Sequence, residues 1–251
     1  MSAVEKKLGQ AYREAEVIPF DENAKFVLMS DCHRGQVNNG DNFLPSQNLF
    51  FGALEYYFDE GYTYIELGDG DELWENRNMH AIIDTHSDAF WMMSRFYEAG
   101  RFYMLYGNHD IVKSRKSFTK KHCHDYYCDS TDCCHPLFPG IKIRQSLVLE
   151  DEEKRQLLLV HGHQGSTLND QLWPLARFLV RYVWRPLELV GFKAPTGSGR
   201  PNEKKDRIEK ELSGYAKKNR RILVAGHTHR PVFPKPGEGF YFNDGSCVHP
   251  R

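Results

Sequence analysis

Short apolar segments that end in polar residues recur along this chain of 251 residues. They cover residues 25–30, 62–67, 101–106, 156–160 and 221–225. Each segment has the length of a buried strand, and each stops at a loop that contains Asp, Asn or His. In open α/β sheets, functional sites form beyond the carboxyl ends of the strands. The pattern therefore predicts one site that is built from these five loops.

Helical spacing of apolar residues fills much of the chain between these strands. It predicts helices over residues 4–16, 44–59 and 79–99, while residues 141–149 and 240–243 predict two more strands. Because strands and helices alternate, the fold class predicted is α/β. The length fits one core, so we expect a single domain over residues 1–251.

Two stretches interrupt this alternation. Residues 111–140 form a long polar connection that contains cysteines. Residues 165–220 hold two helical parts separated by a Pro/Gly/Ser-rich loop at 193–201. We interpret 165–220 as a helical cap that is inserted between two core strands.

Composition narrows the choice of partner and compartment. The 33 Lys and Arg against 34 Asp and Glu give a net charge of 33 − 34 = −1, so the surface as a whole does not attract one sign of charge. No basic and aromatic pattern predicts specific nucleic-acid binding. No apolar run approaches the about 18 residues of a membrane span, and the first residues lack the apolar core of a secretory signal. With only six cysteines, the chain is expected to be cytoplasmic with free thiols.

The strand-end loops carry residues that commonly bind metal ions. In chain order they are Asp31 and His33, Asp69, Asn108, His161, and His227 and His229. Each alone is also typical of an ordinary loop, and Asp71 is a rival for Asp69 because the Gly-Asp dipeptide is repeated. An extended backbone places residues i and i+2 on one side, so each pair with that spacing could grip one ion.

Taken together, the ordered motifs D-x-H, G-D, G-N-H-D, H and G-H-x-H resemble those of the calcineurin-like metallophosphoesterase superfamily over about residues 25–230. The resemblance implies a four-layer αββα sandwich of two mixed sheets flanked by helices. It also implies two divalent metal ions, Mn, Fe or Zn, at the strand ends. Asp31, His33 and His229 would hold one ion and Asn108, His161 and His227 the other, with Asp69 bridging them.

The same resemblance implies hydrolysis of a phosphoester by a metal-bridging hydroxide. His109 would act as the general acid, and Glu72 would orient it. We favour a phosphomonoesterase; the alternatives are a phosphodiesterase and a lipid-precursor pyrophosphate hydrolase, similar to the UDP-2,3-diacylglucosamine hydrolases. Those hydrolases carry Arg where His109 stands. An alternative of another class is a non-catalytic protein-binding scaffold of the same fold, which the presence of all seven ligands argues against.

Basic residues outside the motifs are candidates for binding the phosphorylated substrate. Arg177 and Arg181 share one face of a predicted helix in the cap, and Lys113 follows the third motif. A solvated helix face is the other interpretation of the two arginines, and peripheral membrane contact through the cap stays open. Residues 122–135 hold four Cys and three His, but their C-x4-C-x4-C-C spacing favours a loop over a zinc site.

Overall fold

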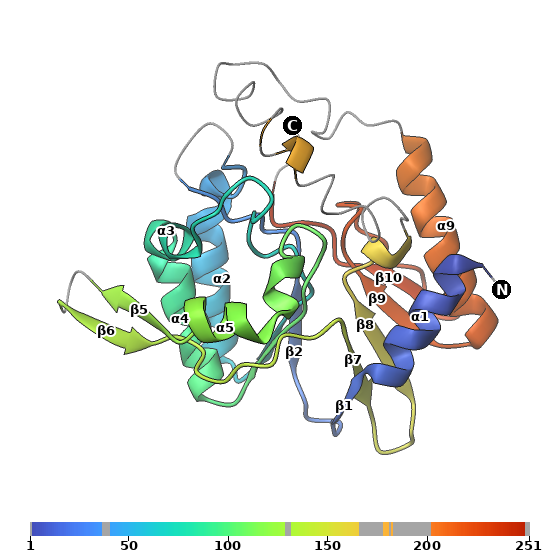
Figure 1. Ribbon diagram of the computed structural model, residues 1–251. Helices are drawn as coiled ribbons and strands as arrows, with labels where there is room; N and C mark the ends of the chain where they lie inside the picture. The colour runs from blue at the N-terminus through green and yellow to red at the C-terminus, as the bar shows by residue number, and fades with distance from the viewer. Residues whose placement is uncertain are drawn as a thin grey trace.

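Two β-sheets carry the fold in the computed structural model, which describes residues 2–36, 41–128, 132–165, 178–180, 182 and 202–248 (Figure 1). The larger sheet has the order β1 (Glu16–Pro19), β7 (Ser146–Glu150), β8 (Gln156–Val160), β9 (Ile222–Ala225) and β10 (Tyr241–Asn243). The smaller has the order β2 (Phe26–Met29), β3 (Thr63–Glu66) and β4 (Phe102–Met104). The larger sheet is mixed, because β7 and β8 are antiparallel while its other neighbours are parallel. The smaller sheet is parallel throughout, which differs from the expected second mixed sheet.

Alternating side chains of the strands bury both faces of each sheet. In β7, Leu147 and Leu149 pack in the cluster between the two sheets, with Ile65 of β3, while Val148 points to the opposite face. In β3, Tyr64 likewise packs away from that cluster. This alternation is the period of two expected for strands that are covered on both sides.

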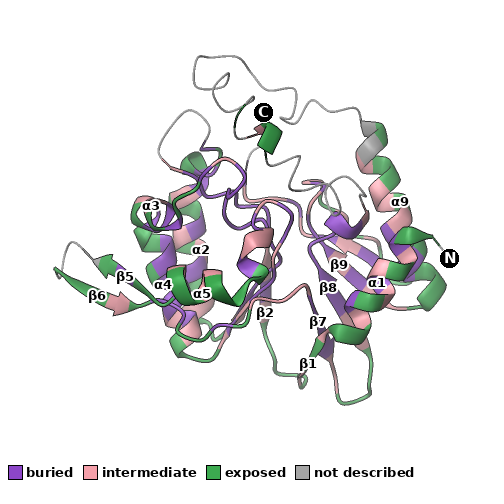
Figure 2. Cartoon of the chain, in the orientation of Figure 1, coloured by how far each residue is buried: buried purple, intermediate pink, exposed green. Residues whose placement is uncertain are grey.

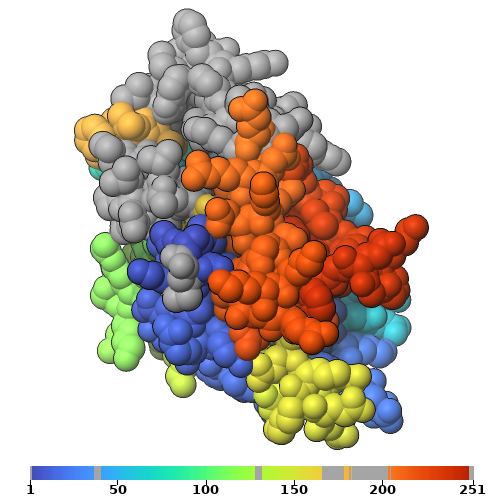
Figure 3. Space-filling view, turned by 90° about the vertical axis from the view of Figure 1, so that its right-hand side faces the viewer, coloured from blue at the N-terminus to red at the C-terminus, as the bar shows by residue number. Residues whose placement is uncertain are grey.

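Helices cover the two outer faces. α1 (Ala3–Glu14) and α9 (Asn202–Asn219) pack on the five-stranded sheet, while α2 (Gln47–Asp59) and α4 (Ser87–Glu98) pack on the three-stranded sheet. α3 (Met79–Thr85) packs against α4. Figure 3 shows α9, in orange, lying against α1, in blue. The predicted mixed α/β sandwich is therefore confirmed. None of the described helices is long and apolar enough to cross a membrane.

Two details of the element prediction differ from the structure. The single helix predicted over 79–99 is interrupted at His86, whose buried ring lies 2.7 Å from Gln47 Oε1 and 3.1 Å from Asp41 Oδ2. The edge strand β1 was not predicted, because it is only four residues long and mostly exposed. It is defined by parallel pairing with β7 rather than by a local pattern.

The two stretches that interrupted the alternation are described in part. The described part of residues 111–140 forms η2 (Ile111–Ser114), α5 (Lys116–His122) and the antiparallel pair of strands β5 (Asp125–Cys128) and β6 (Cys133–Pro136) rather than a loop. Most of the predicted cap lies outside the described residues. At its two ends, η3 (His163–Gly165) lies beside α1 and α9, and α9 packs on the five-stranded sheet. Figure 2 shows that buried residues continue from the strands into the loops at their upper ends.

Candidate metal centre

The backbone at the predicted ligands is unusual. Five of the eight non-glycine residues with a left-handed backbone in the described part of the chain are predicted ligands: Asp31 (φ 52°), His33 (φ 49°), Asp69 (φ 50°), His227 (φ 68°) and His229 (φ 56°). The expectation of an extended backbone at the two i, i+2 pairs is therefore wrong. Left-handed residues with a Cβ are uncommon, and they cluster where a functional geometry requires them.

Two glycines allow the two carboxylates of the site to approach the neighbouring loops. A Cβ on Gly107 would lie 2.1 Å from Asp69 Oδ1, and one on Gly226 would lie 2.5 Å from Asp31 Oδ2. Any larger residue would displace the carboxylate or the loop. Close approach of the carboxylates thus explains Gly107, which opens the G-N-H-D motif, and Gly226, which opens the G-H-x-H motif.

Asp31, His33 and His229 form the first group of converging ligand atoms, all within 4.8 Å of one another. Asp31 Oδ1 lies 3.0 Å from His229 Nε2 and 3.6 Å from His33 Nε2. The two imidazole Nε2 atoms are 3.3 Å apart. One carboxylate oxygen and two imidazole nitrogens thus face a common point, as a divalent cation requires.

Asp69, His161 and His227 form a second group within the same 4.8 Å limit. His161 Nε2 lies 3.1 Å from Asp69 Oδ2, while its Nδ1 lies 3.1 Å from the Leu67 carbonyl oxygen. Because a carbonyl only accepts, Nδ1 is the donor, and in the neutral ring this leaves the Nε2 lone pair facing the site. Asn108 lies in the adjoining loop, and its buried Oδ1 has no hydrogen-bond partner in the described structure.

Asp69 connects the groups. It belongs to the second group and also to a third one, with His33 and His109. Its carboxylate is thus within reach of side chains from both predicted ion sites. Asp71, the alternative from the repeated Gly-Asp, lies instead 2.7 Å from Arg34 Nε and outside all three groups.

Neighbouring side chains shift the pKa values of the buried titratable groups in the site. Burial alone would raise the pKa of Asp31, but His229 and His161 bring it well below its usual value. Burial would lower the pKa of His161, yet Asp69 and Asp31 raise it to about 9. His227 behaves oppositely, because burial and the nearby His161 lower its pKa to about 3. The buried N and O donors of this cluster fit divalent metal ions.

His109 and Glu72 lie together at the edge of this cluster. Glu72 Oε2 is 2.7 Å from His109 Nδ1 and 3.0 Å from His33 Nδ1. The His109 backbone N–H donates to Asp69 Oδ1 at 2.7 Å, and its ring stacks on Trp74 with 4.2 Å between ring centroids. The His109 side chain is 25% exposed. Glu72 and Trp74 thus hold the His109 ring, which still reaches solvent. The sequence did not predict the stacking by Trp74.

A buried ionic cluster lies beneath these loops. Lys113 Nζ lies 2.6 Å from Asp71 Oδ2, 2.8 Å from Asp110 Oδ2 and 3.9 Å from Glu66 Oε1. Arg34 pairs with Glu66 at 2.8 Å and with Asp71 at 2.7 Å. Asp110 Oδ1 in turn accepts from the Gly107 N–H at 2.7 Å, so the cluster braces the loop that carries Asn108 and His109. Lys113 is only 1% exposed, so the predicted substrate contact is corrected to a structural role.

A polar chain from the end of β10 also reaches the site. Ser30 Oγ lies 2.5 Å from Asp31 Oδ2 and 2.9 Å from Asp244 Oδ1. Burial and the nearby Asp31 raise the pKa of Asp244 to about 8, and the Ser30 hydroxyl connects the two carboxylates. Residues 243–246 are polar and follow the strand predicted over residues 240–243. Had this loop been included with the other strand-end loops, it would have identified Asp244.

The other predicted positions are resolved only in part. Arg177 and Arg181 lie outside the described residues. Within the part of the chain that the structure describes, no cysteine joins a group of candidate metal ligands, and Cys133 and Cys134 are exposed on the hairpin.

The comparison with protein families agrees with the predicted resemblance. A family model described as calcineurin-like phosphoesterase matches residues 24–231. A similar solved structure is a conserved uncharacterised protein from Streptococcus pneumoniae, described as a predicted phosphoesterase. It shares 15% identity over 90% of this chain and 74% of that chain, with a TM-score of 0.37. No curated protein matches this chain.

Proposed function

This chain belongs to the calcineurin-like phosphoesterase family, which makes it a metal-dependent hydrolase of phosphoester bonds, and we propose that it is a dinuclear phosphomonoesterase. The observation that carries the proposal is the position of Asp69, whose carboxylate is within reach of imidazoles from both ligand groups. A carboxylate has two oxygens and can therefore bridge two ions. A non-catalytic scaffold would not require such a cluster of buried ligands.

Seven side chains would hold the two ions. Asp31, His33 and His229 would hold one, Asn108, His161 and His227 the other, and Asp69 would bridge them. Two divalent ions bring +4 and the two carboxylates bring −2, which leaves +2 to attract an anionic phosphoester. Mixed N and O donors suit Mn, Fe or Zn. When bound, such ions supply Lewis-acid polarisation of phosphoryl oxygens and lower the pKa of water toward neutrality.

His109 is the residue we assign to proton transfer. Its Nδ1 lies 2.7 Å from Glu72 Oε2, and this contact fixes the orientation of the ring. Trp74 covers one ring face and so restricts rotation. Nε2 is then left to donate a proton to the leaving oxygen of the substrate. Loss of such a general acid typically costs about 10²–10⁴ in rate.

The test is hydrolysis of p-nitrophenyl phosphate and bis(p-nitrophenyl) phosphate by metal-quantified protein, with added Mn²⁺ and with chelator. We expect Mn²⁺-dependent turnover of the monoester and faster reaction than with the diester. Preference for the diester would replace the monoesterase by the phosphodiesterase alternative. Two bound ions without turnover of either ester would favour the lipid-precursor pyrophosphate hydrolase.

Variants separate ligands from the acid. Asp69→Asn should lose metal and activity, whereas Asp84→Asn, a change at an exposed position of α3, should keep both. His109→Gln should keep two equivalents of metal and lose kcat. If the metal content of His109→Gln falls as it does in Asp69→Asn, His109 is a ligand and the proposed proton transfer is wrong.

A further inference from the structure

The two oxygens of the Asp31 carboxylate have different surroundings. Oδ1 faces the imidazoles of the first ligand group, 3.0 Å from His229 Nε2 and 3.6 Å from His33 Nε2. Oδ2 instead accepts from the His227 backbone N–H at 2.8 Å and lies 2.5 Å from the Ser30 hydroxyl oxygen. A carboxylate oxygen has two lone pairs, so these two groups occupy Oδ2. Oδ1 is therefore the oxygen that is left to bind an ion.

The Ser30 hydroxyl is itself held by a carboxylate from the other sheet. Ser30 follows β2 directly and Asp244 follows β10 directly, and Ser30 Oγ lies 2.9 Å from Asp244 Oδ1. Ser30 is buried, and a Cβ on Gly226 would lie 2.1 Å from its Oγ, so the missing side chain leaves room for the hydroxyl. Among the residues that the structure describes, Ser30 is the only side-chain hydrogen-bond partner of the Asp244 carboxylate. Asp244 thus reaches Asp31 through a single hydroxyl.

Attachment of the loop after β10 does not by itself require this contact. The Cys247 N–H donates to the Ser30 carbonyl at 3.3 Å, and Ser246 Oγ donates to the Asp31 carbonyl at 3.1 Å. Both bonds end on main-chain atoms, and neither involves Ser30 Oγ or the Asp244 carboxylate. What the contact between Ser30 and Asp244 adds is a link to the carboxylate of a predicted metal ligand.

We propose that Ser30 and Asp244 are positioning residues of the metal centre, which hold Asp31 Oδ2 so that Oδ1 faces an ion. That ion is the one that Asp31, His33 and His229 would bind, and the inference rests on the proposed function, which supplies it. Asp244 acts on Ser30, and Ser30 acts on Asp31. Loss of a group that orients a metal ligand typically costs about 10–100-fold in metal affinity.

Titration of chelator-treated protein with Mn²⁺ tests this without any substrate. EPR measures the free Mn²⁺, and the bound ions follow by difference. We expect the wild type to bind two ions, and Ser30→Ala to raise the Kd of one of them about 10–100-fold with little change in the other. Unchanged affinity for both ions would overturn the proposal. A wild type that binds a single ion would overturn the dinuclear centre, yet weaker binding of that ion by Ser30→Ala would still support the positioning role.

Variants of Asp244 test the order of action. Asp244→Ala should weaken the same ion as Ser30→Ala, whereas Asp244→Asn keeps a group that can hydrogen-bond to Ser30 and should bind both ions as the wild type does. The double variant with Ala at both positions should bind no more weakly than Ser30→Ala alone, because Asp244 acts through Ser30. Additive losses, or an Asp244→Asn as weak as Asp244→Ala, would mean that the charge of Asp244 acts directly and would overturn this order.

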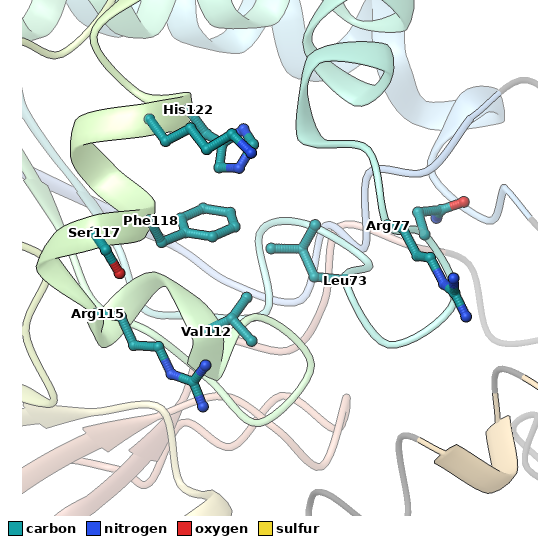
Figure 4. Close-up of a pocket in the computed structure, with 9 residues that line it drawn as sticks. Leu73, Arg77, Val112, Arg115, Ser117, Phe118 and His122 are labelled. Carbon is teal, nitrogen blue, oxygen red and sulfur yellow. The ribbon is translucent and has the colours of Figure 1, made fainter.

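Two other serines provide controls. Ser94 is buried in α4, where its Oγ donates to the Trp91 carbonyl at 2.7 Å. Ser117 is exposed in α5, and Figure 4 shows it at a pocket of about 510 Å³ that none of the seven proposed ligands lines. Ser94→Ala and Ser117→Ala should both leave the affinity for the two ions unchanged. A loss in Ser94→Ala equal to that in Ser30→Ala would show that removal of any buried hydroxyl weakens the site, and would overturn the proposal.

Discussion

Lys113→Met is expected to destabilise the protein strongly, although the residue lies in a basic stretch that resembles a solvated surface. Its ammonium lies among Asp71, Asp110 and Glu66, and it is 1% exposed. With Arg34 included, the cluster holds two cations and three carboxylates, a sum of 2 − 3 = −1. Removing Lys113 leaves −2 in the same buried volume.

The magnitude follows from the geometry. Burial would lower the pKa of Lys113, but the three carboxylates hold it well above its usual value, so the residue is charged in the native state. Breaking a buried pair by removing one partner costs about 3–5 kcal/mol. Met fills a similar volume, so the cavity adds little. The expected loss is a large part of the about 5–15 kcal/mol that stabilises a typical domain.

Urea unfolding of the chelator-treated proteins at pH 7 measures this loss. Lys120→Met, an exposed change in α5, should stay within about 0.5 kcal/mol of the wild type. A loss below about 1 kcal/mol for Lys113→Met would refute the reasoning, because such a small value is typical of an exposed pair.

The pH dependence provides a second check. Burial would raise the pKa of Asp71, but Arg34 and Lys113 lower it to about 2. In the wild type, the ionised Asp71 therefore stabilises the fold above the usual pKa of an Asp, and this stabilisation is lost as the pH falls toward 2. Without Lys113 the carboxylates of the cluster should have raised pKa values in the folded state. Their penalty is then relieved as they take up protons, so the difference from wild type should shrink between pH 7 and pH 5. A difference that is constant with pH would contradict this account.

Three further outcomes are expected. Gly107→Ala should lower metal content and activity, because the new Cβ would lie 2.1 Å from Asp69 Oδ1. Gly52→Ala, on the open face of α2, should change neither quantity. Metal analysis and turnover measure both. Metal binding should release protons and become tighter as the pH rises toward 9, because the pKa of His161 is raised to about 9 without metal. Calorimetry in two buffers of different ionisation enthalpy measures the number of protons released. Binding without any proton release would contradict this expectation. Burial and the nearby His80 and Lys121 lower the pKa of His122, so NMR should find its ring neutral at pH 7; a charged ring at this pH would contradict the buried position of the side chain.

The sequence could predict the fold and the chemical character of the site because both depend on local patterns. Apolar segments that end at Asp, Asn or His predicted the strands and the ligand loops, and these loops do meet in space. The left-handed backbone at Asp31 and His33 could not be predicted, since it results from contacts with other loops; the His33 N–H, for example, donates to the Asp69 carbonyl at 2.9 Å.

Long-range pairing explains the main error. Lys113 lies near other basic residues in the sequence, and its local pattern is that of a solvated face. Its partner Asp71 is 42 residues earlier in the chain (113 − 71), and Glu66 belongs to β3. A buried ion pair between separate loops leaves no periodic signal. The stacking of Trp74 on His109 escaped prediction for the same reason.

Contacts between Asp31 and loops much later in the chain bear on when the site can form during synthesis. Asp31 is among the first parts of the site to leave the ribosome, yet its carboxylate accepts from the His227 N–H at 2.8 Å and its carbonyl accepts from Ser246 Oγ at 3.1 Å. These partners are 196 and 215 residues later in the chain. A nascent chain therefore exposes Asp31 and His33 until residues 227–246, which include these partners, have been synthesised. We therefore expect the proposed metal centre to bind its ions in this geometry only after the loops that follow β9 and β10 have joined Asp31.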